Sequence, residues 1–283
     1  MVCGHSVHRR RSSPSYSPDL VTSSQHSNLS RFRQLLVNTP VPLDLAALTF
    51  SGHCQGRTLD FDGELSKLDN LAEQVSTRTL RGVVECLFDD LGFAGDEVEY
   101  FSPENSYLDK VIENKRGIPI SLAVLVIEVA RRCSVRALGI GMPGHFLVQE
   151  YEDPNNFVNP FKGEMMTRDD AQEIFVRLHP SAEFKDDYLA QVTNQAILSR
   201  MLNNLRLIHL KDRSTKDLIP TLELGLCFDN PSLAEARQLA SALEAVGRTD
   251  DAARQMDELA ERSDQRETDE IRALGTRLWS RLN

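Results

Sequence analysis

Long apolar runs, closely paired cysteines and an excess of basic residues are all missing from this sequence of 283 residues. The longest apolar stretch, residues 120–127, ends at Glu128, far short of the roughly 20 residues that span a bilayer. The formal net charge of -10 argues against broad nucleic-acid binding, because phosphate contacts require clustered Lys and Arg side chains. We therefore expect neither a membrane span nor a nucleic-acid partner.

The five cysteines are odd in number and widely spaced, with no C-x-x-C pair and no histidine at zinc-site spacing: Cys3, Cys54, Cys86, Cys133 and Cys227. This pattern predicts reduced thiols in a cytoplasmic protein. The sequence as a whole implies neither a metal nor an organic cofactor. Cys86 lies within an apolar helical pattern and is expected to be a packed core thiol rather than a nucleophile.

The first 30 residues differ from the rest, because three arginines (residues 9–11) precede a run rich in Ser, Pro and His with few aliphatic side chains. Such a segment cannot bury enough apolar surface to offset its ordering entropy, so we expect a disordered tail over residues 1–30. A transit peptide and a start codon assigned too early are the alternatives. A twin-arginine export signal is disfavoured, since no apolar region follows the arginines.

The next part of the chain is mainly helical in pattern. Residues 35–93 place apolar side chains three and four apart with glycines after the runs, which predicts a small cap of helices. Pro103 interrupts helix continuation, and Asn105 or Ser106 is expected to cap a helix that starts near Tyr107.

Residues 105–163 indicate a central helix followed by strands. Leu122, Leu125, Val126 and Val129 recur at helical spacing, which predicts a buried helix. The segments RALGIG and HFLVQEY then alternate or run apolar and predict two adjacent strands, and FVNPF predicts a third. The order, helix and then antiparallel sheet, is typical of an α+β fold.

The motifs NSYLDKVIENKRGIPISLAVLVIEVARR, GMPGHFLV and NPFKGE follow one another in this order. Together they resemble the SirB-type transglutaminase-like family, a bacterial branch of the papain-like and transglutaminase fold. The resemblance covers residues 60–180 most strongly. It implies a transglutaminase-like domain over residues 31–182, in which a central helix packs on an antiparallel sheet beneath a helical N-terminal cap.

The resemblance also implies where a catalytic site belongs. In active transglutaminase-like enzymes a cysteine opens the central helix, a histidine follows on a strand, and an Asp before Pro orients the histidine. His145 and Asn159 fit the last two places, and Asn can also orient an imidazole. An ungapped alignment puts Pro119 at the cysteine place. Ser121 lies two residues on, about 200° around the helix, so it is either a replacement nucleophile or a helix-capping residue.

By the same resemblance, Asn105, Tyr107, Arg116 and Pro119 are expected to line the binding cleft. Two local alternatives stay open. His145 can be a structural strand histidine, and Asp109 with Arg116 can form a surface charge pair.

Residues 183–283 are helical in pattern and contain a weak repeat with an offset of 33 residues. Small, turn and apolar residues fall at tetratricopeptide-like places in two copies: Leu207, Leu210, Ile219, Leu226 and Pro231, then Ala240, Gly247, Ala252, Met256 and Leu259. This spacing predicts a tetratricopeptide-like (TPR-like) region, with an ordinary helical hairpin as the alternative.

Two functions follow. The first is a non-catalytic, transglutaminase-like protein that binds a protein or peptide partner, because the nucleophile place is occupied by Pro119. The alternative is a hydrolase or acyl-transferase that uses Ser121, His145 and Asn159.

Overall fold

The computed structural model describes residues 18–229, 232–262 and 265–282. The arginines at positions 9–11, Cys3 and Pro231 therefore lie outside the described residues. The first helix, α1 (Pro18–Leu36), begins before the domain boundary expected at residue 31. Leu29, Phe32, Leu35 and Leu36 pack from this helix against the main core, which explains why a segment expected in the tail is helical.

Three further helices follow and confirm the predicted helical pattern: α2 (Leu43–Cys54), α3 (Phe61–Glu73) and α4 (Leu80–Val84). The Asp60 side chain caps α3 by accepting from the Gly63 N–H, and Thr79 caps α4 at the Gly82 N–H. A π-helical segment, η1 (Glu85–Asp90), continues α4 and carries Cys86, which is buried as predicted.

The central part begins with short elements and leads into α6 (Pro119–Arg132). Strand β1 (Ala94–Gly95) pairs in parallel with β2 (Arg116–Gly117), and a 3₁₀ helix η2 (Pro103–Ser106) precedes α5 (Leu108–Asn114). The predicted side-chain cap of α5 is wrong, because Tyr107 occupies the cap position without a capping hydrogen bond. The α6 side chains from Pro119 to Ala130 are all buried, which confirms the predicted central helix.

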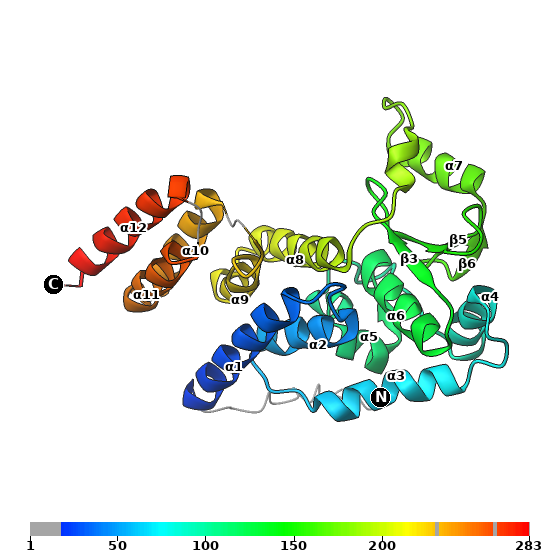
Figure 1. The fold of residues 1–283 in the computed structure, drawn as a ribbon, viewed down its shortest axis with the longest axis horizontal. Coiled ribbons are helices and arrows are strands. Elements are labelled where there is room, and N and C mark those ends of the chain that lie inside the picture. Colours follow the sequence, from blue (N-terminus) through cyan, green and yellow to red (C-terminus); the bar gives the residue numbers. More distant parts are fainter. Residues whose placement is uncertain (1–17, 230–231, 263–264, 283) are drawn as a thin grey trace, which may run out of the picture.

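One antiparallel sheet packs on α6. Its strand order is β3 (Ala137–Ile140), β4 (Leu147–Glu150), β5 (Phe157–Asn159) and β6 (Glu164–Met166). Successive side chains alternate between the two faces: Val148 and Val158 join the core that contains α6, whereas Leu147 and Phe157 join a second core with α7 (Arg168–Leu178). The sheet therefore lies between α6 and α7, and the fold is α+β (Figure 1).

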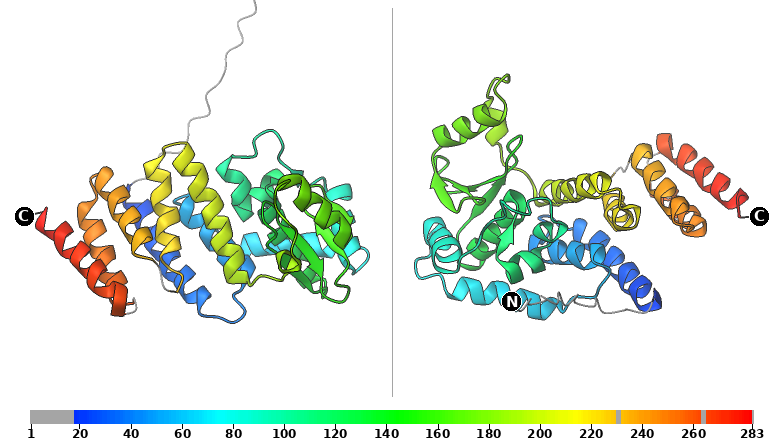
Figure 2. Two further views of the ribbon diagram at one scale, coloured as in Figure 1. Left: turned by 90° about the horizontal axis from the view of Figure 1, so that it is seen from above. Right: turned by 180° about the vertical axis from the view of Figure 1, so that it is seen from behind.

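The C-terminal part is helical: η3 (Asp186–Leu189), α8 (Asn194–Lys211), α9 (Thr215–Gly225), α10 (Leu233–Ala245), α11 (Thr249–Ala260) and α12 (Gln265–Ser280). Helix α8 belongs to the main core through Ile197, Met201 and Leu205. Side chains of α9 to α12 form a separate core, and Figures 1 and 2 show α10 to α12 at the end of the molecule away from the sheet. In the described parts of the chain, no helix is both long and apolar enough to cross a membrane.

Candidate active-site groove

Two of the predicted site residues meet at one end of the sheet. Asn159 is the last residue of β5, and His145 lies two residues before β4, its antiparallel neighbour. The Nε2 atom of His145 is 2.9 Å from Oδ1 of Asn159. The sheet register therefore brings together the histidine and the asparagine that the sequence pattern singled out.

Their hydrogen bonds define the proton position on the imidazole. The Phe161 N–H donates to Asn159 Oδ1 (3.3 Å), which identifies that atom as the amide oxygen, an acceptor only. His145 Nε2 must consequently carry a proton and donate to the same oxygen. In the neutral ring the Nδ1 atom then holds a free lone pair. It makes no hydrogen bond within the described chain and is not closed off from solvent.

The surroundings of His145 favour this neutral form. Burial lowers the pKa of the imidazole, and the nearby Arg200 guanidinium lowers it further, whereas the bond to Asn159 raises it. The net pKa lies below the usual histidine value, so the ring is uncharged at neutral pH. A neutral imidazole with Nδ1 exposed can accept a hydrogen bond or a proton.

The loop that carries His145 is held from two sides. His179, which follows α7, donates from Nε2 to the Pro143 carbonyl (3.2 Å). From α8, the Arg200 guanidinium donates to the carbonyls of Met142 (3.0 Å) and His145 (2.7 Å). Gly144 has a φ of 76°, and a Cβ there would lie 2.8 Å from His179 Nε2, so this turn requires glycine. These contacts join residues 36 to 58 positions apart in the sequence and fix the backbone of the loop that carries the imidazole.

A groove of about 570 Å³ opens beside the pair. Its apolar part comes from β6 and α7, through Met165, Met166, Ile174 and Leu178, and its rim includes Lys162, Glu164, Glu173 and Arg177. The sequence reasoning missed these residues. The available signal was the Thr167–Asp170 capping box followed by Ile174 and Leu178 at a spacing of four, which marks an amphipathic helix directly after β6.

Ser121 is not part of this groove. Its hydroxyl donates to the Asn105 carbonyl (2.5 Å) and accepts from the Ile118 N–H (3.1 Å), and its side chain is fully buried. No hydrogen bond joins Ser121 to His145 in the described structure. Of the two roles expected for Ser121, these contacts describe the helix cap.

The start of α6 also offers fewer free donors than an unmodified helix terminus. Pro119 occupies the first helical position and has no N–H, and the Ile118 N–H is already bonded to Ser121. Within the first turn of α6, the N–H groups of Ile120 and Ser121 make no hydrogen bond to the described part of the chain. The start of α6 therefore has few free N–H groups with which it could bind an oxyanion.

Comparison of the sequence with known proteins identifies the family of this chain. The family model of the transglutaminase-like superfamily matches residues 62–203, half of the chain. The chain belongs to the transglutaminase-like superfamily. It is 42% identical over 147 residues to a UPF0162 protein of Xylella fastidiosa strain 9a5c, an alignment that covers 48% of this chain and 52% of that protein.

Two further relatives are less similar in sequence. A UPF0162 protein of Pseudomonas aeruginosa is 28% identical over 175 residues, covering 57% of this chain and 64% of its own. F-box only protein 21 of Mus musculus is 26% identical over 168 residues, covering 55% of this chain and 26% of its own. The chain spans about half the length of the first curated relatives that it matches. No solved structure matches it.

In this transglutaminase-like protein, the four residues expected to line the binding cleft lie outside the His145 groove. Asn105 is buried and donates from its side chain to Asp96 and to the Glu99 carbonyl. Tyr107 is buried against Phe50, and Pro119 is buried at the start of α6. Arg116 is exposed and donates to the carbonyls of Gly92 and Lys115.

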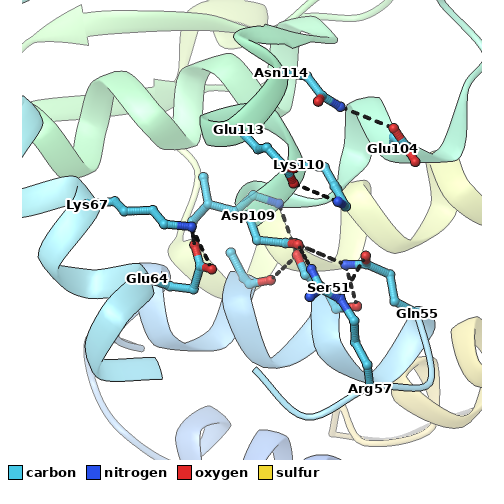
Figure 3. Close-up of polar contacts among 12 residues, drawn as sticks. Ser51, Gln55, Arg57, Glu64, Lys67, Glu104, Asp109, Lys110, Glu113 and Asn114 are labelled. Atoms are coloured by element: carbon cyan, nitrogen blue, oxygen red, sulfur yellow. Dashed lines mark hydrogen bonds and ion pairs between the residues drawn. The ribbon is translucent and has the colours of Figure 1, made fainter. Parts of the chain in front are cut away.

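The alternative of a surface charge pair between Asp109 and Arg116 is wrong. Asp109 is buried, and its carboxylate accepts from Gln55 Nε2 (3.0 Å) and pairs with Arg57, as Figure 3 shows. Arg57 follows α2, so the pair joins α2 to α5. The helices bring together partners that are 52 residues apart, which local sequence spacing does not indicate.

Neither a thiol nor a metal cluster is found beside His145 in the described part of the chain. Cys54 contacts Thr221, Cys133 contacts the Ala72 carbonyl and Cys227 contacts the Glu223 carbonyl, while Cys86 is buried in η1. Burial raises the pKa of the Cys227 thiol to about 11, which disfavours its reactive thiolate. The described residues also hold no group of three side chains suited to a metal ion.

The tautomer assigned to His145 leads to a pH prediction. Substitution Asn159→Asp places an anion at Oδ1 and stabilises the imidazolium, so the pKa of His145 should rise by about 1–3 units. The matched control Asn155→Asp changes an exposed residue in the loop before β5 and should leave that pKa unaltered. Histidine side-chain resonances followed by NMR against pH report the value. An unchanged pKa in Asn159→Asp contradicts the assigned hydrogen bond.

Proposed function

We propose that this transglutaminase-like protein binds a peptide segment or a protein partner in the His145 groove, without covalent chemistry. One observation carries the proposal: the Ser121 hydroxyl donates its hydrogen bond to the Asn105 carbonyl, at a helix start where Pro119 stands in the place at which the resemblance expects a cysteine. A nucleophilic serine has to pass its proton to a base within reach. The groove thus retains an oriented imidazole beside Asn159 without a nucleophile in contact with it.

The groove suits an extended segment with an apolar side chain. Met165, Ile174 and Leu178 supply apolar surface on one side of His145. The free Nδ1 atom of His145 can accept a hydrogen bond from a ligand N–H or O–H. A partner that combines a donor with an apolar side chain would be held at both points.

Finer assignments are part of the same proposal. We assign the chain to the SirB-type branch and to the cytoplasm, on the motif order and the unpaired cysteines described above. We also propose that the C-terminal helices are TPR-like. Two consecutive helical hairpins, α8–α9 and α10–α11, support this, because their second helices begin at residues 215 and 249, close to the repeat offset, and the second hairpin turns at Gly247, with a φ of 79°.

A second candidate function is favoured by the His145–Asn159 pair itself. An oriented neutral imidazole is the base that a hydrolase or acyl-transferase requires. Catalysis through Ser121 would require its hydroxyl to leave the Asn105 carbonyl and reach Nδ1 of His145. The two candidates therefore differ in whether a bound ligand is chemically changed.

Two matched substitutions on α7 test whether the His145 groove is the binding site. Leu178 and Val176 are similarly exposed, 47% and 49%, but only Leu178 lines the His145 groove. Random peptides displayed on phage and selected on the wild-type protein should bind Leu178→Asp at least about tenfold more weakly. Their affinity for Val176→Asp should stay within about twofold. Fluorescence polarisation gives both affinities, and thermal melting confirms that both variants fold.

Equal affinity for the three proteins would place the selected peptides elsewhere on the surface and remove the groove as the binding site. Equal losses in both variants would indicate a general effect of charge on α7, and would contradict the proposal in the same way.

A further inference from the structure

A second groove lies among the helices of the C-terminal part. Helices α8, α9 and the start of α10 enclose a groove of about 340 Å³, which shares no lining residue with the first. Leu202, Leu222 and Phe228 provide apolar surface in it. A Cβ added to Gly225 would meet no atom within 4 Å, so the backbone of α9 is open to a ligand there.

Among the residues that line this groove, Arg206 stands out because its Nε–H is buried without a hydrogen-bond partner. Its guanidinium forms no ion pair or hydrogen bond with the described residues, although Nε is shielded from solvent. An arginine with a buried, unbonded N–H is costly unless a ligand supplies the acceptor. Planar guanidinium groups bind carboxylates through two parallel hydrogen bonds, so the missing acceptor fits a carboxylate.

The other polar groups in the groove restrict the class of ligand that can bind there. Glu235 is engaged with Ser232 in the capping box of α10, whereas Asp229 makes no ion pair with Arg206. A ligand with one carboxylate close to an apolar side chain fits this arrangement. The Asp229 carboxylate would repel a ligand that carries several acidic groups, and it can accept a hydrogen bond from a backbone N–H of the ligand. The C-terminal residue of a peptide combines these features: an α-carboxylate, an apolar side chain and its own N–H.

We propose that the Arg206 groove binds the C-terminus of a peptide or protein whose last residue is apolar. The α-carboxylate pairs with Arg206, and the side chain packs on Leu202, Leu222 and Phe228. The small volume suits a chain end rather than a helix. This site is independent of the His145 groove.

The test uses three pools of synthetic pentapeptides at about 1 mM, a concentration that detects weak complexes. The first ends in Leu, Ile, Val, Phe or Met with a free carboxylate. The second is the same pool as C-terminal amides, and the third carries one internal Glu and an amide end. The readout is the shift of the Arg206 Nε–H signal in ¹H–¹⁵N NMR spectra of the full chain.

The proposal predicts that the first pool shifts the signal and binds at least about tenfold more tightly than the amide pool. In variants that lack the Arg206 signal, the backbone amide signals along the groove measure peptide binding. Arg206→Gln should abolish binding, and Arg206→Lys should weaken it. The control Arg237→Gln, at an exposed ion pair with Glu270, should bind normally.

Three outcomes overturn the proposal: no shift with the first pool, an equal shift with the amides, or binding that survives Arg206→Gln. A shift with the internal-Glu pool alone would assign the groove to acidic side chains instead of chain ends.

Discussion

Replacement of Glu223 by alanine should destabilise the protein by about 3 kcal/mol, because it removes a buried acceptor at a junction of three helices. Glu223, on α9, accepts from His53 Nε2 on α2 (3.0 Å) and from Gln255 Nε2 on α11 (2.9 Å). Both His53 and Glu223 are buried. The loss should lower the melting temperature by roughly 6–12 °C for a chain of this size.

The control is Glu258→Ala, on α11. Glu258 pairs with Arg33 at 3.5 Å, but its side chain is 60% exposed, so its removal should cost less than about 1 kcal/mol. Thermal denaturation at one pH compares the two variants. Equal melting temperatures would show that the buried contact does not join the C-terminal helices to α2.

The substitution Gly163→Ala should be similarly costly, about 2–4 kcal/mol, and should also disturb the site. Gly163 has a φ of 70°, and a Cβ there would lie 2.5 Å from Cγ of Phe88. Its N–H donates to the Asn159 carbonyl (2.9 Å), so the strain falls on the turn that orients Asn159. We expect both a lower free energy of unfolding in urea and a shifted His145 NMR signal.

A double-mutant cycle separates the two causes of this loss. Phe88→Ala removes the clash with the ring atoms but keeps the Cβ of residue 88, 2.6 Å from the added methyl, so Gly163→Ala should cost about 1 kcal/mol less than in the wild type. The comparison variant Gly225→Ala, where a Cβ meets open space, should stay within about 1 kcal/mol of the wild type. Strict additivity of Gly163→Ala and Phe88→Ala would contradict the described packing.

The sequence predicted the features that depend on local pattern. The apolar spacing of α6 marked a buried helix, and the alternation around β4 and β5 marked strands of one sheet. His145 and Asn159 could be paired in advance, because both were placed by motif order near the ends of neighbouring strands. These predictions needed only periodicity and the transglutaminase-like pattern.

Features that depend on tertiary contacts could not be predicted in this way. The role of Ser121 depends on the Asn105 carbonyl, which η2 brings to the start of α6. Asp109 finds Arg57 because α2 packs beside α5. The groove wall depends on α7 folding back over the sheet, and Arg200 reaches the His145 loop from α8. The spacing of residues along one sequence does not indicate which distant segments will come into contact.

The central claim is that the His145 groove binds a ligand without changing it. The most direct measurement is intact mass spectrometry of the wild-type protein and its phage-selected peptides after prolonged incubation, with Ser121→Ala as the reference. We expect protein and peptides both to keep their original masses and the two proteins to behave alike. Peptide cleavage, or an acyl adduct on Ser121, in the wild type but not in Ser121→Ala would contradict it and establish the catalytic alternative.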